Sequence, residues 1–123
     1  MAVCLIVGSY NALAATHYVS LASAAPSAPY ASWSTAATNI QDAVDVAAPG
    51  DLVFVAAGVY AQGSMVTPNT APATSLGNRV VIGSRINVIS TGGPAVTVIA
   101  GAGPCTNWAV RCVYLTNAFL GGF

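Results

Sequence analysis

Residues 33–60 read WSTAATNIQDAVDVAAPGDLVFVAAGVY and combine a helical pattern, a turn and an apolar strand in one continuous stretch. Thr38 and Gln41 have the spacing of a capping box, in which two side chains satisfy free amides at the N-terminus of a helix. We therefore predict a helix from Thr38 to about Ala48. The i, i+3, i+4, i+7 spacing of its apolar residues predicts a buried face made of Ile40, Ala43, Val44 and Ala47.

The other face of this predicted helix is polar. Gln41, Asp42 and Asp45 are expected to point into water, and the two carboxylates lie near the N-terminal turns, where they favour the helix dipole. Pro49 and Gly50 end the helix. The sequence therefore predicts a short amphipathic helix that covers an apolar core.

Most of the remaining chain is predicted to form strands. Residues 52–55 are fully apolar and bounded by Gly50 and Gly58, which is typical of a strand buried on both faces. The links lack Asn-Gly and Asp-Gly turns, so parallel sheets are favoured over hairpins. Residues 61–78, rich in Gly, Pro, Asn, Ser and Thr, are expected to lie outside the sheets. The other predicted strands are 16–23, 80–82, 86–89, 96–99 and 112–115.

A weak internal repeat aligns residues 79–82 with residues 111–114. It places Arg79 beside Arg111 and predicts that Val81 and Val113 stack in neighbouring repeats. Repeats of this kind are typical of stacked units, none of which can bury its apolar face alone.

The NIQDAVD helix, the PGD turn and the VFVAAGVY strand resemble the N-terminal portion of right-handed parallel β-helix proteins of the pectin-lyase-like type. RVVIGSRINVIS at 79–90, GPAVTVIAG at 93–101 and VRCVYLTNAFLGGF at 110–123 are similar to the coil strands that follow in that family. The resemblance implies a mainly β fold, a right-handed parallel β-helix (solenoid) of two to three coils with an N-terminal capping α-helix.

In that fold, residues 16–123 would be the N-terminal part of a β-helix domain that is truncated at its C-terminus, and the remaining coils of the parent chain would pack on its last strand. Trp33 is expected to close the open end of the solenoid as a core aromatic, rather than to stack on a sugar. The residues expected to form the structural cap are Thr38, Ile40, Gln41, Val44 and Trp33.

The first 15 residues are predicted to be a secretory signal peptide. An apolar run from Met1 to Val7 precedes Ala12-Leu13-Ala14, whose small-x-small pattern suits signal peptidase, so cleavage is expected after Ala14 or Ala15. The run is too short to span a bilayer. We therefore expect a secreted or cell-surface protein with bacterial-type export and no membrane-spanning segment.

Charge excludes several partners. Charged residues make up 5% of the chain, three acidic and three basic, and hydrophobic residues make up 55%. A chain without a basic field does not neutralise phosphates, so nucleic-acid binding is not expected. Uncharged surfaces rich in Ser, Thr and Asn over buried Val and Ile strands agree with stacked parallel sheets.

The cysteines leave two alternatives. Cys105 and Cys112 form a candidate disulfide in an oxidising compartment, or Cys112 is a small buried residue on a strand and Cys105 a loop thiol. No zinc site is expected, because His17 lies far from both cysteines in the sequence. Without a motif that pairs it with a nucleophile, His17 is expected to be a surface histidine.

No catalytic residue, cofactor or metal ligand is predicted. The resemblance implies that polysaccharide-active relatives use carboxylate clusters, often with Ca²⁺ and an Arg or Lys base. Asp42 and Asp45 are expected on a solvated helix face, and Asp51 is expected to hydrogen-bond the turn backbone. Arg79 and Arg111 are expected to stack on one another or to bind a carboxylate, rather than to act as a lyase base.

Two function classes follow from these expectations. The first is the N-terminal cap and first coils of a secreted β-helix protein with a carbohydrate-related role, in which this fragment is non-catalytic and its partner is a polysaccharide. The alternative is part of a polysaccharide lyase or glycoside hydrolase whose catalytic coils lie beyond the end of this chain.

Overall fold

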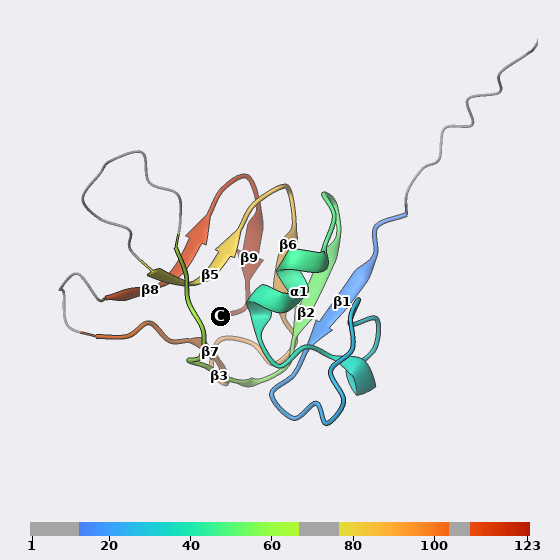
Figure 1. The fold of residues 1–123 in the computed structure, drawn as a ribbon, viewed down its shortest axis with the longest axis horizontal. Helices are drawn as coiled ribbons and strands as arrows, with labels where there is room; N and C mark the ends of the chain where they lie inside the picture. The colour runs from blue at the N-terminus through green and yellow to red at the C-terminus, as the bar shows by residue number, and fades with distance from the viewer. Residues whose placement is uncertain (1–12, 67–76, 104–108) are drawn as a thin grey trace, which may run out of the picture.

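The computed structural model describes residues 13–66, 77–103 and 109–123, and it is mainly β (Figure 1). One α-helix, α1 (Ile40–Val46), and one 3₁₀ turn, η1 (Trp33–Thr35), lie in these ranges. The strands are β1 (Thr16–Val19), β2 (Leu52–Val55), β3 (Gly58–Tyr60), β4 (Met65–Val66), β5 (Gly77–Ile82), β6 (Asn87–Ser90), β7 (Thr97–Ile99), β8 (Val110–Leu115) and β9 (Phe119–Gly121).

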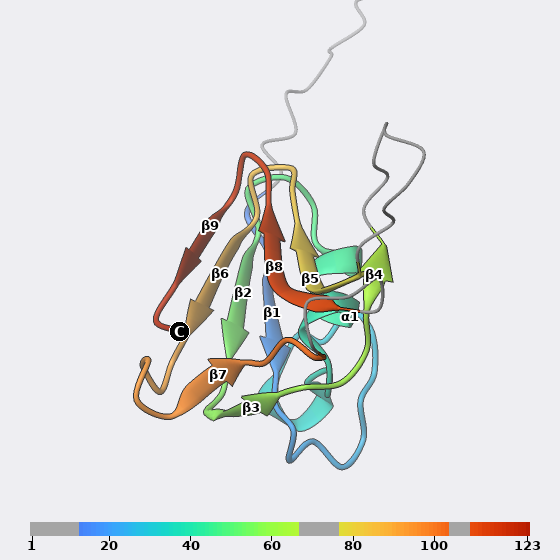
Figure 2. The same ribbon diagram turned by 90° about the vertical axis from the view of Figure 1, so that its left-hand side faces the viewer.

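The strands form three sheets that the chain visits repeatedly. The largest has the order β1-β2-β6-β9 with parallel pairing throughout, and its strands lie side by side in Figure 2. A second sheet pairs β3 with β7 in parallel, and a third has the order β4-β5-β8. The chain passes through the three sheets as β2, β3 and β5, and then as β6, β7 and β8. Each later strand therefore pairs alongside its counterpart from the earlier pass.

The predicted strands and their parallel pairing are largely confirmed. Strand β2 has the predicted bounds, and the later predicted strands overlap β5, β6, β7 and β8. The predicted loop 61–78 is only partly correct: residues 61–64 lie outside the sheets, but the range also contains β4, antiparallel to β5, and the first residues of β5. Its residues 67–76 lie outside the described part of the chain. Strands β3 and β9 have no predicted range of their own, but they lie within VFVAAGVY and VRCVYLTNAFLGGF, the stretches that the resemblance assigns to strands.

The predicted register between the two repeats is wrong by one residue. Val80, rather than Val81, pairs with Val113, and Val81 pairs with Tyr114. Since successive side chains on a strand point to opposite faces, a slip of one residue exchanges the core and solvent faces. Val80 is accordingly buried, whereas Val81 is half-buried.

The N-cap of helix α1 lies one residue later than the capping box predicts. Asn39 is the N-cap, and its Oδ1 accepts a hydrogen bond from the Gln41 amide at 2.9 Å, while Thr38 is exposed. Asn is as favourable as any residue at an N-cap, so it replaces Thr38 in this role. The helix ends at Val46, because the backbone of Ala47 is extended. Two residues that were assigned to the helix, Ala47 and Ala48, are therefore outside it.

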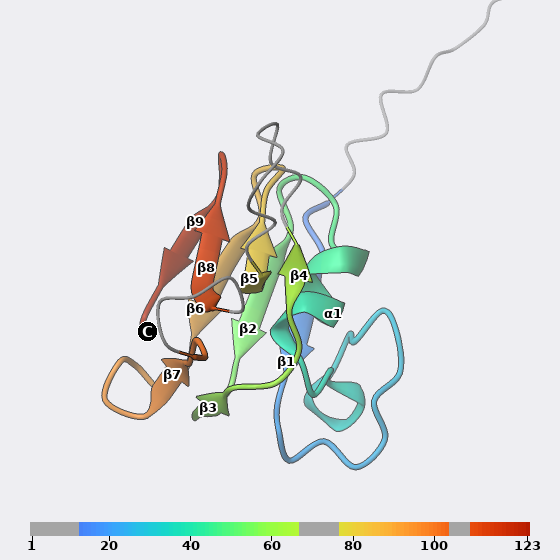
Figure 3. The ribbon, with the colours of Figure 1, turned by 60° about the vertical axis from the view of Figure 1, so that its left-hand side comes forward.

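The apolar face of α1 packs on the core as predicted. Ile40, Ala43 and Val44 are buried, and Ala47 is partly buried against the same cluster. The helix contacts β1, β2 and β5, and it lies at the β1 end of the molecule, away from β9 (Figure 3). The buried core cluster consists of Val19, Ala37, Ile40, Ala43, Val44, Val53, Val55, Tyr60, Val80, Ile82, Ile86, Val88 and Ile99.

Gln41 does not point into water as predicted, because it is 8% exposed and binds β5. Its Oε1 accepts a hydrogen bond from the Val81 amide at 2.7 Å, and its Nε2 donates to the Val81 carbonyl at 3.2 Å. Nε2 also donates to Asp45 Oδ1 at 2.8 Å. The Gln41 amide therefore offers β5 the donor and acceptor that a neighbouring strand would supply.

Candidate functional site

Three aromatic side chains form a row on the outer face of the four-stranded sheet. Alternation along β1 and β2 buries Val19, Val53 and Val55 in the core, so Tyr18 and Phe54 point to the opposite face. These two residues are register partners, and their ring centroids lie 6.1 Å apart. We call Trp33, Tyr18 and Phe54 the aromatic row.

Trp33 extends this row from outside the sheet. Its ring lies 4.7 Å from that of Tyr18 at an interplanar angle of 61°, an edge-to-face contact. Trp33 is 44% exposed. The expectation that it closes the core is therefore wrong, because Ile40, Ala43 and Val44 of α1 cover the core at this end and leave the indole on the surface.

The segment that carries Trp33 is fixed along the free edge of β1 by backbone hydrogen bonds. The Tyr18 amide donates to the Tyr30 carbonyl at 2.8 Å, and the Ala37 amide donates to the Tyr18 carbonyl at 2.9 Å. The Ser32 hydroxyl lies 2.9 Å from the Thr35 hydroxyl, across the 3₁₀ turn. Trp33 is therefore held on both sides of its turn, and hydroxyl groups lie beside it.

An aromatic row bordered by hydroxyls suits a ligand with one apolar face and polar edges. Aromatic rings bury large areas and contact C–H groups on their faces, while hydroxyls both donate and accept hydrogen bonds. A sugar ring has this combination of an apolar C–H face and an equatorial rim of hydroxyls. Because the aromatic row runs across two strands, it offers more than one aromatic ring to a ligand made of several sugar rings.

A buried histidine and a buried aspartate tie β1 to the turn between α1 and β2. His17 Nε2 lies 3.0 Å from Asp51 Oδ2, and His17 Nδ1 lies 2.7 Å from the Pro29 carbonyl oxygen. Asp51 also accepts hydrogen bonds from the amides of Ala48, at 2.7 Å, and Ala15, at 2.8 Å. The expected surface position of His17 is wrong, since its exposed fraction is 4%. The expected turn role of Asp51 is confirmed by its bond to Ala48.

This environment shifts the ionisation of Asp51. Burial by itself would raise the pKa of the carboxyl, but the hydrogen bonds from His17, Ala48 and Ala15 outweigh it and lower the pKa below its ordinary value of 3.8. Both ring nitrogens of His17 already face oxygen atoms, so neither is available to activate a hydroxyl or thiol nucleophile. The arrangement is suited to holding three segments together rather than to catalysis.

The acidic residues are spread over the surface and the turn. Asp42 and Asp45 are exposed on α1 as predicted, and Asp45 accepts the bond from Gln41. Asp51 is buried with both oxygens engaged. In the ranges that the structure describes, no three His, Cys, Asp or Glu side chains gather into a group that could hold a metal ion.

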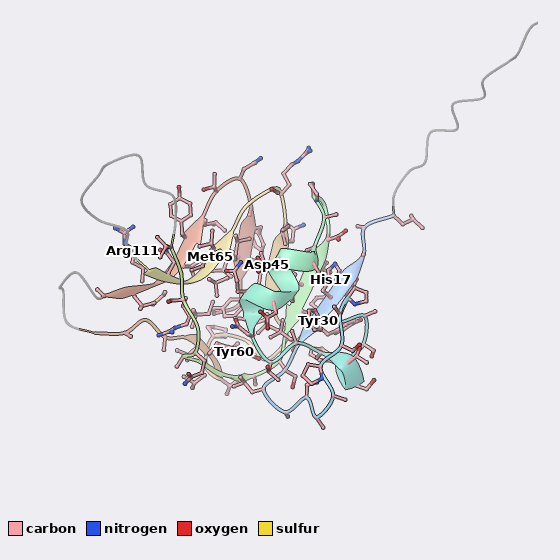
Figure 4. All side chains as sticks on the ribbon, viewed as in Figure 1. His17, Tyr30, Asp45, Tyr60, Met65 and Arg111 are labelled. Atoms are coloured by element: carbon pink, nitrogen blue, oxygen red, sulfur yellow. The ribbon has the colours of Figure 1, made fainter. Side chains whose placement is uncertain are left out.

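The two arginines occupy different environments, and the expected stacking of Arg79 on Arg111 is wrong. Arg79 is 7% exposed, and its Nε donates to the Ala100 carbonyl at 2.7 Å and its Nη1 to the Gly63 carbonyl. Arg111 pairs in register with Asn78 and is exposed at the far side of the molecule from His17 (Figure 4). The one-residue slip of register explains why Arg111 does not lie opposite Arg79.

Cys112 is exposed on β8, so the alternative in which it is a buried small residue is wrong. Cys105 lies outside the described residues, and its pairing with Cys112 stays a prediction.

Three features of this region were not predicted from the sequence. They are the hydrogen bonds of Gln41 to the backbone of β5, the buried contact of His17 with Asp51 and the surface position of Trp33. The spacing of Gln41 on the polar face of α1 gives no signal for its role, because the strand it binds lies 40 residues away. A histidine at an inward position of an alternating strand was an available signal for burial.

Within the described residues, the chain has no helix of the length and apolar character that crossing a membrane requires. Comparisons of the chain with protein-family models, curated proteins and solved structures gave no match.

Proposed function

We propose that this chain is the N-terminal cap and first coils of a secreted, right-handed parallel β-helix protein, and that it binds polysaccharide through the aromatic row. The repeated passage of the chain through three sheets, with parallel pairing between passes, supports the β-helix. Helix α1 at the β1 end supports its role as the cap. The sequence features of residues 1–15 support secretion.

The observation that carries polysaccharide binding is the exposed position of Trp33 at the end of a row with Tyr18 and Phe54. Exposing a large indole costs hydrophobic free energy, and a rigid, backbone-fixed indole binds a ligand with little loss of entropy. The chain offers no basic field for an anionic partner held by charge. Stacking on neutral or weakly acidic sugars fits both facts.

The remaining coils of a longer parent chain are a second proposed partner. Strands β8 and β9 carry exposed apolar side chains, among them Tyr114, Leu115 and Phe119. Parallel strands added beside β8 and β9 would cover these side chains and satisfy the edge backbone groups.

The alternative proposal is that the parent is a polysaccharide lyase or glycoside hydrolase. A hydrolase needs two carboxyl groups about 5 to 9.5 Å apart across one bond. Asp42 and Asp45 lie on an exposed helix face, and Asp51 is buried among its own hydrogen-bond donors. The catalytic coils of such an enzyme would therefore lie outside this chain.

Affinity electrophoresis and calorimetry with a panel of neutral and acidic polysaccharides test the proposal. We expect Trp33→Ala to weaken binding about tenfold, corresponding to about 1.4 kcal/mol for one lost stacking contact. Tyr114→Ala is the matched control, because Tyr114 is 42% exposed on a different sheet and should leave the affinity within about twofold. Equal affinities for the wild type and Trp33→Ala would reject the aromatic row as the binding surface.

The same panel distinguishes binding from turnover. Unsaturated-product absorbance and reducing-end release are measured with and without Ca²⁺. Turnover that is lost in Asp42→Asn or Arg111→Ala would overturn the non-catalytic proposal for this chain. Binding without turnover is the expected result.

A further inference from the structure

Asp51 holds the backbone of the chain at the residue where the sheet begins. Its Oδ1 accepts a hydrogen bond from the Ala15 amide nitrogen at 2.8 Å. The Ala15 carbonyl in turn accepts a hydrogen bond from the Leu52 amide at 2.9 Å. Ala15 is thus tied to the start of β2 through both of its backbone groups, whereas Leu13, two residues earlier, is 92% exposed.

The sequence left two cleavage positions open, after Ala14 and after Ala15. Cleavage after Ala15 would remove the amide that Asp51 binds and the carbonyl that Leu52 binds. Cleavage after Ala14 keeps both contacts and makes the Ala15 nitrogen a terminal ammonium beside a carboxylate that is 6% exposed. The two alternatives therefore differ in what they leave at Asp51.

The geometry points to processing between Ala14 and Ala15, with the new α-ammonium of Ala15 bound by Asp51. A signal peptidase hydrolyses this amide. The bond between the Ala14 carbonyl carbon and the Ala15 nitrogen breaks, one water is consumed, and a carboxylate and an ammonium form. This inference rests on the proposed export of the chain, and it is independent of polysaccharide binding.

Processing strengthens an existing contact rather than creating a new site. Asp51 Oδ2 is already engaged by the Ala48 amide and His17 Nε2, so Oδ1 is the position that the ammonium takes. The Asp51 carboxylate already makes the bond to the Ala15 amide charge-assisted, and the ammonium adds an opposite charge at hydrogen-bond distance from a carboxylate that is 6% exposed. The processed chain is therefore held more firmly at the junction of β1, the α1–β2 turn and β2 than the precursor.

The first experiment exports the full chain from a bacterial host and reads the secreted product by intact mass and N-terminal sequencing. The expected product begins Ala15-Thr16-His17. A product that begins at Thr16 would overturn the assigned site. Absence of cleavage would overturn both the site and the proposed export.

The second experiment uses the absence of lysine from this sequence, which leaves the α-amine as the target for mild acetylation of the processed protein. Removing the charge at Ala15 should lower the melting temperature by about 5 °C, the shift for roughly 1 kcal/mol in a domain of this size. Asp42→Asn should keep this shift, and Asp51→Asn should abolish it. An unchanged melting temperature after acetylation of the wild type would overturn the ammonium contact even if cleavage occurs after Ala14. This wild-type measurement does not depend on whether Asp51→Asn folds.

Discussion

Replacing Gln41 by alanine tests whether this side chain closes the edge of β5. The substitution removes the bonds from Oε1 to the Val81 amide, 2.7 Å, and from Nε2 to the Val81 carbonyl, 3.2 Å. Each backbone hydrogen bond contributes about 1 kcal/mol net, and an amide left without a partner at a half-buried position costs about 1 kcal/mol more. Alanine regains a few tenths of a kcal/mol in helix propensity. We expect the free energy of unfolding to fall by about 2 to 3 kcal/mol.

Urea unfolding at neutral pH, followed by circular dichroism, measures this loss as a shift of the midpoint at constant slope. Gln41→Glu separates hydrogen bonding from packing, because the glutamate has nearly the same shape but cannot donate to Val81 and repels Asp45. It should be at least as destabilising as Gln41→Ala. Asp42→Asn is the matched control on the exposed face of α1 and should change stability by less than about 0.5 kcal/mol. A loss below about 0.5 kcal/mol for Gln41→Ala would refute the reasoning.

Three further predictions concern buried groups. Val44→Asp should lower the free energy of unfolding by several kcal/mol, because it places an unpaired carboxylate against the core. Loss of the circular dichroism signal would reveal this destabilisation. A native-like urea midpoint would contradict the packing of α1. The lowered pKa of Asp51 contributes stability above about pH 3.8 that is lost as the pH falls through the folded-state pKa. Asp51→Asn should therefore be less stable at neutral pH. In urea titrations its free energy of unfolding should also decrease less at acidic pH than that of the wild type. Burial raises the pKa of Tyr60 from 10.0 to about 12, so the stability that this shift contributes below pH 10 should be lost between these two pH values. Tyr60→Phe should remove this alkaline loss. It should also cost about 1 kcal/mol at neutral pH, because it removes the hydrogen bond from the Tyr60 hydroxyl to the Ala56 carbonyl.

Local patterns predicted the elements of this fold well. Apolar spacing identified the buried face of α1 through Ile40, Ala43 and Val44, and the apolar run of β2 gave its bounds. The absence of hairpin turns pointed to parallel pairing, which holds for every strand pair in the described residues except β4 with β5. These features depend on neighbours within a few positions of the chain, where periodicity and turn chemistry act directly.

The contacts between distant segments could not be predicted in the same way. The weak repeat aligned Val81 with Val113, but one residue of slip is invisible in a run of similar apolar residues, and the slip pairs Arg111 with Asn78 rather than with Arg79. The aspects of the candidate site that matter most, the exposure of Trp33 and the burial of His17, depend on how the segment between β1 and α1 folds along the edge of β1. The exposure of Trp33 has no signature within its own stretch of sequence, whereas the alternation along β1 gave a signal for the burial of His17 but not for its partner Asp51.

Parallel pairing between successive passes also governs how this chain can fold. Contacts such as the one between Thr91 and the Val55 carbonyl join residues 36 positions apart, and Gln41 reaches across 40. Each such contact requires closure of a long loop before any ladder energy is gained. We expect refolding over milliseconds to seconds, with little structure before β2 and β6 meet. A chain that folds this slowly remains unfolded for longer after synthesis. An unfolded chain can still pass through a protein-conducting channel.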